Sequence, residues 1–182
     1  MNIYEESPKI LKTKVDSVSF GTCVHKIIEL TDLVNASYDD VLNSTNRVLE
    51  EFNANNLNKA VLAKRILKMI ESLKSQNIIT KNSKIEKEYE FVIKDKLYGI
   101  VENELEEPSL IQGIIDMYIE NEDECIIVDF KTDRVDTQEE LKERYLPQLS
   151  VYKRGIKLAL GKTADVYIYS FSLDRLIKID IW

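Results

Sequence analysis

Apolar residues recur every three or four positions through the first part of the chain, which is the spacing of an amphipathic helix. The pattern predicts one helix from Ser19, as its N-cap, to about residue 34, and two more over residues 38–52 and 58–76. Residues 1–16 lack this periodicity, and we expect them to form an arm ahead of the domain. The apolar stripe of the first predicted helix consists of Phe20, Val24, Ile27 and Ile28.

Beyond residue 78 the apolar period changes to two, the period of a half-buried strand. We expect an acidic loop over residues 102–109 and a polar turn over residues 120–123. One long helix interrupts the strands and ends at Gly161, a residue suited to the left-handed conformation that terminates helices. The expected strands cover residues 84–93, 97–101, 110–119, 124–130, 164–171 and 175–181, and the expected helix covers residues 137–160.

This order of elements predicts an α+β (α/β) domain with a central mixed sheet flanked by helices and a helical segment at its N-terminal end. The length of 182 residues fits one domain. We therefore expect a single domain over residues 17–182, with a helical part over about 17–78 and a sheet core over about 79–182.

Composition excludes several classes of protein. No uninterrupted apolar run exceeds four residues, which excludes a transmembrane helix and the core of a signal peptide. Cys23 and Cys125 each lie within an apolar run, as expected for buried free thiols in a reducing, cytoplasmic compartment. Two cysteines are too few for a cysteine-ligated iron–sulfur cluster or a four-cysteine zinc site.

The charge balance is unusual for a nucleic-acid binder. The 25 Lys and Arg residues stand against 32 Asp and Glu residues, giving a formal net charge of −7, whereas proteins that bind nucleic acid unaided are usually basic. Residues 79–124 hold 13 acidic and 5 basic residues, so the excess lies in the middle of the chain. An acidic cation-binding site is therefore worth seeking there.

Two carboxylates and a lysine fall on one predicted hairpin. If the hairpin turns symmetrically between residues 122 and 123, Asp116 faces Asp129 across neighbouring strands, and Lys131 shares the face of Asp129. Two like charges at that separation repel, and both lie in apolar runs, so something must compensate them. A divalent cation would do so, and a purely structural ion pair with Lys131 is the alternative.

The other polar candidates have ordinary structural interpretations when taken singly. His25 is the only histidine and lies beside the apolar stripe of the first helix, where a structural role is common. Glu88 alternates with apolar residues as an exposed strand residue would. Arg144, Gln148 and Tyr152 are spaced by one helical turn and can form either a solvated face or a surface that grips phosphates and bases.

In combination these segments resemble the RecB-type branch of the PD-(D/E)XK nucleases, and most closely the nuclease domains of AddAB-type helicase–nucleases. The resemblance spans about residues 17–182. It implies a restriction-endonuclease-like core. The segments that carry it are Phe20-Gly21-Thr22-Cys23-Val24-His25, Glu88-Tyr89-Glu90-Phe91, Gly113-Ile114-Ile115-Asp116, Asp129-Phe130-Lys131-Thr132-Asp133-Arg134-Val135, Arg144-Tyr145 and Gln148-Leu149-Ser150-Val151-Tyr152.

The resemblance also implies roles for individual residues. Lys131 matches the catalytic lysine of that family, and Glu88 matches a glutamate on the preceding strand. The implied metal ligands are His25, Asp116, Asp129 and the main-chain carbonyl of Phe130; the implied catalytic set is Lys131, Asp129, Asp116, Gln148, Tyr152 and Glu88; and the implied DNA contacts are Arg144, Gln148 and Tyr152.

The activity implied by the resemblance is metal-dependent hydrolysis of DNA in double-strand break repair. The implied cofactor is Mg²⁺, for which Mn²⁺ should substitute well because an imidazole ligand is softer than Mg²⁺ prefers. The implied partners are single-stranded DNA ends, the helicase part of a longer parent chain and a partner subunit of the AddB type, with no membrane. Two alternatives stay open: a non-catalytic module that docks DNA ends or a partner, and a stand-alone nuclease acting on RNA or phage DNA.

Overall fold

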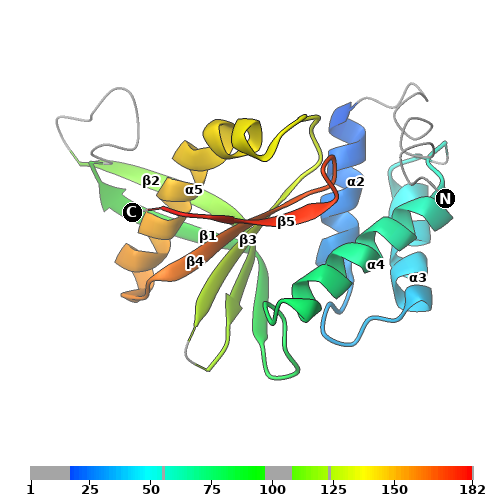
Figure 1. Cartoon of the computed structure of the whole chain (residues 1–182), viewed down its shortest axis with the longest axis horizontal. Helices are drawn as coiled ribbons and strands as arrows, with labels where there is room; N and C mark the ends of the chain where they lie inside the picture. Colours follow the sequence, from blue (N-terminus) through cyan, green and yellow to red (C-terminus); the bar gives the residue numbers. More distant parts are fainter. Residues whose placement is uncertain (1–16, 55, 97–107, 123, 182) are drawn as a thin grey trace.

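The computed structural model describes residues 17–54, 56–96, 108–122 and 124–181 (Figure 1). The predicted arm over residues 1–16, the predicted strand over 97–101 and nearly all of the predicted acidic loop lie outside these residues. The described elements are α2 (Ser17–Leu30), α3 (Tyr38–Glu51), α4 (Lys59–Ser75), β1 (Lys84–Asp95), β2 (Ser109–Glu120), β3 (Cys125–Lys131), α5 (Gln138–Leu160), β4 (Ala164–Ser170) and β5 (Arg175–Ile179).

Local sequence signals fix most helix ends. Ser37 and Asp40 form a capping box at the start of α3, and the side chains of Asn58 and Thr137 cap α4 and α5. Gly161 ends α5 with φ of 70°, the left-handed conformation predicted for it. The prediction for the first helix was wrong at its start, because α2 begins at Ser17 and Ser19 lies inside it.

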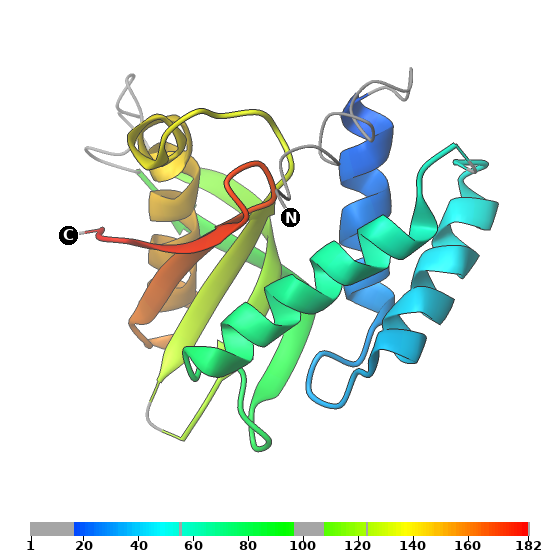
Figure 2. The same ribbon diagram turned by 45° about the vertical axis from the view of Figure 1, so that its right-hand side comes forward.

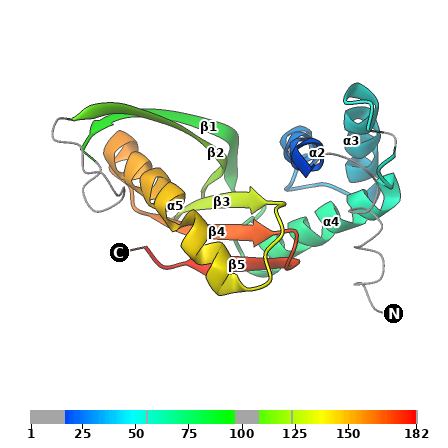
Figure 3. The ribbon, with the colours of Figure 1, turned by 90° about the horizontal axis from the view of Figure 1, so that it is seen from above.

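The five strands form one mixed sheet in the order β1-β2-β3-β4-β5. Strands β3 and β4 are parallel and are joined by the crossover helix α5, whereas the other neighbours are antiparallel. Helix α5 packs on one side of the strands, and α2, α3 and α4 gather at the other (Figures 2 and 3). The chain therefore has the predicted α+β fold with a mixed sheet flanked by helices.

Two apolar cores lie on the two faces of the sheet. The larger core joins α2, α3 and α4 to one face, and the smaller core joins α5 to the other. Strand β3 is buried on both faces, because its apolar residues alternate between the two cores. In β3 the larger core takes Ile126, Val128 and Phe130, and the smaller core takes Ile127.

In β1 and β2 the alternation of side chains between the two cores is interrupted at neighbouring positions of the hairpin. Met117 packs in the larger core while Ile115, two residues earlier, packs in the smaller one. In β1 the same change falls between Ile85 and Tyr89. Between them lies Glu88, whose φ of 51° is left-handed and interrupts the strand geometry. The long hairpin therefore presents different faces to the helices on either side of this point.

The two cysteines agree only in part with the sequence prediction. Both cysteines are free; Cys23 is buried as predicted, whereas Cys125 is only half-buried because it begins β3. Among the described residues, no helix combines the length and apolar character needed to cross a membrane.

Candidate active site

The hairpin between β2 and β3 has the register predicted from its turn. Glu120 pairs with Cys125, and Met117 pairs with Val128; the ladder ends there, and Asp116 and Asp129 each lie one position beyond its last pair. The two carboxylates are close enough that the charge of Asp116 helps to raise the pKa of Asp129. Both acidic residues therefore belong to one site.

His25 reaches this rung from helix α2. Its Nε2 atom lies 3.0 Å from the main-chain oxygen of Phe130, and its Nδ1 atom lies 3.5 Å from Asp116 Oδ1. Burial lowers the pKa of His25, but Asp116 and the Phe130 carbonyl outweigh it and leave that pKa raised. Asp116 Oδ2 in turn accepts a hydrogen bond of 2.7 Å from the Phe130 amide. These three residues thus form one connected polar group.

The close approach of α2 to the end of β3 depends on Gly21. A methyl group added at Gly21 would lie 2.8 Å from Oγ1 of Thr132, too close for a real contact. Gly21 precedes His25 by one helical turn, so the missing side chain lets α2 sit near enough for the imidazole to reach Phe130. The neighbour that the missing side chain accommodates is the side chain of Thr132.

Asp129 is the most buried member of the site, with 1% of its surface exposed. Burial and the neighbouring Asp116 raise its pKa to about 6, against the opposing effect of Lys131. Its Oδ2 atom lies 2.8 Å from Lys131 Nζ, and among the residues that the structure describes no donor is aligned to form a hydrogen bond with it. This carboxylate oxygen is therefore compensated by charge alone.

Helix α5 closes the other side of the site. Lys131 Nζ donates to Gln148 Oε1 over 3.1 Å, and Gln148 Nε2 donates to the Tyr152 hydroxyl over 2.7 Å. Burial and the charge of Asp129 raise the pKa of Tyr152 to about 12, so this hydroxyl stays protonated at neutral pH. Gln148 and Tyr152 lie on one helix face, as their spacing predicts.

Glu88 lies at the edge of the same group. One oxygen of its carboxylate, one of Asp116 and one ring nitrogen of His25 all lie within 4.8 Å of one another. Glu88 is exposed, and partial burial together with the charge of Asp116 raises its pKa. Its register position faces Asp116, and its left-handed backbone is a strained conformation for a side-chain-bearing residue.

Arg144 is engaged elsewhere. Its Nη1 atom lies 2.6 Å from Asp133 Oδ2, and its Nη2 atom lies 2.7 Å from Glu140 Oε1. A phosphate would have to compete with two carboxylates for this guanidinium. The pairing with Glu140 follows from their spacing of one helical turn and could have been foreseen, whereas the pairing with Asp133 depends on how the loop before α5 folds.

The sequence did not predict two contacts of Lys131, although one of them comes from Tyr145, which lies in a segment that carries the resemblance. The ring of Tyr145 lies under the Lys131 ammonium, 4.2 Å from the ring centroid. The Lys131 carbonyl accepts a hydrogen bond of 2.8 Å from the amide of Phe171, just after β4. Arg65, on α4, donates to the Phe171 carbonyl and lies 5.7 Å from its ring centroid. No local sequence signal indicates the contact between Arg65 and Phe171, because 106 positions separate the two residues.

Replacing Arg65 with methionine is expected to lower the free energy of unfolding by about 2 kcal/mol, because it leaves the Phe171 carbonyl without its donor. The apolar stem is retained, so the loss reports the polar contact. Urea unfolding followed by circular dichroism measures the change. Lys64→Met is the matched control, since Lys64 is exposed on the same helix. Equal unfolding midpoints for the two variants would contradict the assignment.

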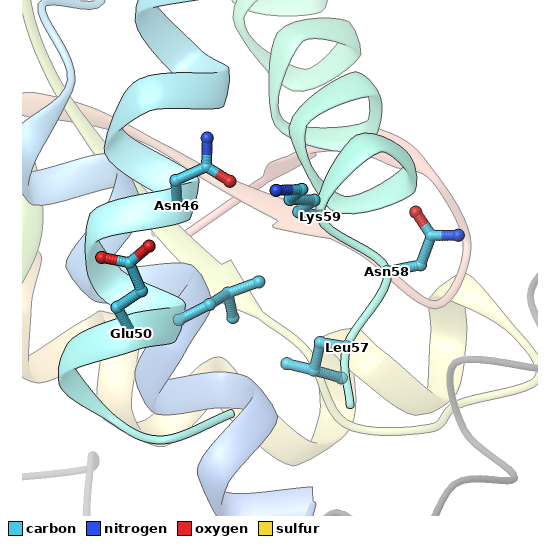
Figure 4. Close-up of a pocket in the computed structure, with 6 residues that line it drawn as sticks. Asn46, Glu50, Leu57, Asn58 and Lys59 are labelled. Carbon is cyan, nitrogen blue, oxygen red and sulfur yellow. The ribbon is translucent and has the colours of Figure 1, made fainter. Parts of the chain in front are cut away.

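The cavities away from this group carry no comparable chemistry. One, of about 280 Å³, opens between the end of α3 and the start of α4 (Figure 4). Its lining residues are Asn46, Leu49, Glu50, Leu57, Asn58 and Lys59, none of which belongs to the candidate site.

The residues present fit a divalent cation. Carboxylate oxygens, a main-chain carbonyl and one imidazole are ligand types that Mg²⁺ and Mn²⁺ accept. Among the described residues, no aligned hydrogen bond reaches the buried Oδ2 atom of Asp129, so this oxygen has lone pairs available to a cation. His25, Asp116 and Glu88 offer ligand atoms within 4.8 Å of one another, and Asp129 and the Phe130 carbonyl lie beside them, so these are the groups that would hold the ion.

Comparison with known proteins gives the family. A model of the PD-(D/E)XK nuclease superfamily matches residues 3–173. The chain belongs to the PD-(D/E)XK nuclease superfamily. The Asp116, Asp129 and Lys131 group thus lies in a chain whose superfamily is defined by two acidic residues and a lysine, which agrees with the resemblance drawn from the sequence.

Relatives extend the match. The chain is 34% identical over 177 residues to AddA, a component of the ATP-dependent helicase/nuclease of Clostridium botulinum (strain Langeland), covering 93% of the chain and 14% of that relative. It is 27% identical over 191 residues to the protein of the same name from Listeria welshimeri, covering 97% and 15%. The chain thus spans about one seventh of these curated relatives. The crystal structure of SSO0001 is 18% identical, with a TM-score of 0.39 over 90% of this chain and 76% of that one, too distant to carry an argument.

Proposed function

We propose that this chain is a metal-dependent deoxyribonuclease that hydrolyses phosphodiester bonds of DNA. The observation that carries the proposal is the convergence of Asp116, Asp129 and Lys131, in which the buried Asp129 lies between a second carboxylate and the ammonium. Lys131 brings one positive charge to a group in which two carboxylates meet, and a divalent cation would balance the remaining negative charge.

A bound Mg²⁺ or Mn²⁺ would polarise the scissile phosphate and lower the pKa of a water molecule for in-line attack. His25, Asp116, Asp129 and the Phe130 carbonyl are the groups that would hold it, with Glu88 beside them. The hydrogen bond from the Phe130 amide to Asp116 fixes one carboxylate, and the backbone of β3 fixes the other.

The remaining side chains orient the reactants. Lys131 places a positive charge 2.8 Å from Asp129, where it can neutralise charge that develops on the phosphate. Gln148 holds that ammonium through its oxygen and the Tyr152 hydroxyl through its nitrogen. Gln148 and Tyr152 would then fix the DNA strand or the attacking water by hydrogen bonds.

The names of the relatives support a wider context. We propose that the chain is the nuclease part of an AddAB-type helicase–nuclease of the cytoplasm, acting on single-stranded DNA ends during double-strand break repair. Its partners would be a helicase part and an AddB-type protein. The formal charge of −7 fits this context, because other parts of such an assembly would supply affinity for the phosphate backbone.

Cleavage of a single-stranded DNA oligonucleotide is expected with Mg²⁺ or Mn²⁺ and is expected to stop when a chelator removes the ion. Asp116→Asn should reduce the rate by at least about a hundredfold, because it removes one anionic ligand and the partner of His25. The assay is denaturing gel electrophoresis of end-labelled DNA, with RNA of the same sequence alongside.

Cleavage that does not need a metal, or equal cleavage rates for the parent and Asp116→Asn, would refute the proposal. Faster cleavage of the RNA would favour the stand-alone ribonuclease alternative. If neither nucleic acid is cut, calorimetry with Mn²⁺ separates an enzyme that lacks its partners from a non-catalytic docking module. Only a metal site formed by these residues gives binding heat that Asp116→Asn abolishes.

A further inference from the structure

The Lys131 ammonium lies in a cage built from two elements. Strand β3 contributes Asp129, whose Oδ2 atom is 2.8 Å from the nitrogen. Helix α5 contributes Gln148, whose Oε1 atom is 3.1 Å away, and Tyr145, whose ring centroid is 4.2 Å away. Only 15% of the lysine side chain is exposed, so these groups replace much of its hydration.

Tyr145 belongs to a segment that carries the family resemblance, but it is the one neighbour in this cage for which that resemblance implies no role. An ammonium ion within about 6 Å of an aromatic centroid is attracted by the ring face, and more strongly where water is excluded. A lysine has a long flexible stem, so a carboxylate and an amide oxygen alone leave its end free to pivot. The ring closes a third side and limits that movement.

The surroundings of Tyr145 hold the ring in place. Tyr145 precedes Gln148 by three positions on α5, so both side chains project toward the same side of the helix. The adjacent Arg144 ties this turn of α5 to Asp133 in the preceding loop. Burial raises the pKa of Tyr145 to about 12, so the side chain stays a neutral phenol in any ordinary assay.

We propose that Tyr145 is a positioning residue for Lys131, and that its ring face fixes the ammonium beside Asp129 and Gln148. The inference rests on the proposed nuclease function for its catalytic consequence, whereas the contact between ring and ammonium stands on its own. The contribution to Lys131 belongs to the ring face and not to the hydroxyl, which interacts with Asp133 and Arg144; the Tyr152 hydroxyl, by contrast, accepts the hydrogen bond from Gln148.

The test compares Tyr145→Phe with Tyr145→Leu in the full chain. Phenylalanine keeps the ring face, so we expect kcat on single-stranded DNA within about twofold of the parent; leucine removes it, so we expect kcat to fall by about tenfold with KM nearly unchanged. Leu146→Ala is the control on the same helix, because Leu146 is an exposed neighbour, and it should match the parent.

A second readout does not require activity. Lysine labelled with ¹³C at the ε-carbon gives one NMR signal for each residue, and Lys131→Arg identifies the signal of Lys131. An aromatic ring under the ammonium shifts that signal upfield in the parent and in Tyr145→Phe, and the shift should vanish in Tyr145→Leu while the thermal midpoint stays close to the parent.

The outcomes separate the two proposals. A parent that neither cleaves DNA nor gives Mn²⁺ binding heat, but shows the ring shift, would refute the nuclease function and keep the contact. An unshifted Lys131 signal in the parent would overturn the contact. Equal loss of kcat in the phenylalanine and leucine variants would show that the hydroxyl matters and would overturn the role of the ring face, as would a leucine variant with the kcat of the parent.

Discussion

Asp129→Asn is expected to reduce the rate of DNA cleavage by at least about a thousandfold without lowering the stability of the domain. Loss of activity follows because the change removes a central acidic ligand from the proposed metal site. Stability is retained because the carboxylate is unfavourable where it lies: it is buried, it faces Asp116, and its raised pKa of about 6 reports that its charged form is disfavoured. Asparagine keeps the volume and removes the charge.

The measurements are a cleavage assay and thermal unfolding with and without Mn²⁺. Without metal, we expect the variant to unfold at the same temperature as the parent or a few degrees higher, since about 1 kcal/mol corresponds to roughly 2–4 °C in a chain of this size. Mn²⁺ should raise the midpoint of the parent and leave that of the variant unchanged, because an ion that binds only the folded state stabilises it.

The control is Asp165→Asn, which removes an exposed carboxylate paired with Lys178 on the same sheet. An exposed ion pair contributes at most about 1 kcal/mol, so activity and the response to Mn²⁺ should match the parent. The alternative for the Asp129 group, a structural ion pair with Lys131, makes the opposite prediction. It would be supported if Asp129→Asn lost several degrees of stability and kept its activity.

The site could be predicted from sequence where its geometry follows from local rules. The polar turn predicted from the sequence gives the observed hairpin register, and Asp116 and Asp129 then follow the last pair of the ladder on neighbouring strands, with Lys131 near Asp129. The spacing of one helical turn places Gln148 beside Tyr152. These relations need only a turn position and an element type.

Other features depend on contacts that no local pattern encodes. The strict alternation around Glu88 predicts a regular strand, but the left-handed backbone at that residue changes the face on which its neighbours are buried. Arg65 touches Phe171 across two elements far apart in the chain, and Tyr145 meets Lys131 only because α5 crosses back over the sheet. These contacts follow from the packing of elements and not from their periodicity.

Gly155→Ala is expected to lower the thermal midpoint by about 2–6 °C and to slow DNA cleavage. A methyl group at Gly155 would lie 2.5 Å from the Phe91 ring, which also lies within 2.7 Å of the corresponding position at Gly113. Overpacking of this kind costs about 1–3 kcal/mol, partly offset by up to about 1 kcal/mol from the better helix propensity of alanine. Tyr152, one turn before Gly155, packs edge-on against Phe91, so displacement of α5 would carry both Tyr152 and Gln148 away from Lys131 on β3.

Thermal unfolding of a double-mutant cycle with Phe91→Leu tests the mechanism. The smaller, flexible leucine makes room for the added methyl group, so the double variant should be more stable than the sum of the single changes predicts, by about 1 kcal/mol or more. Leu158→Ala, at an exposed position of the same helix, controls for general changes in α5. Strictly additive changes in stability would mean that Phe91 does not pack closely against Gly155. Coupling accompanied by recovered cleavage would establish that α5 brings Gln148 and Tyr152 to the site through this contact.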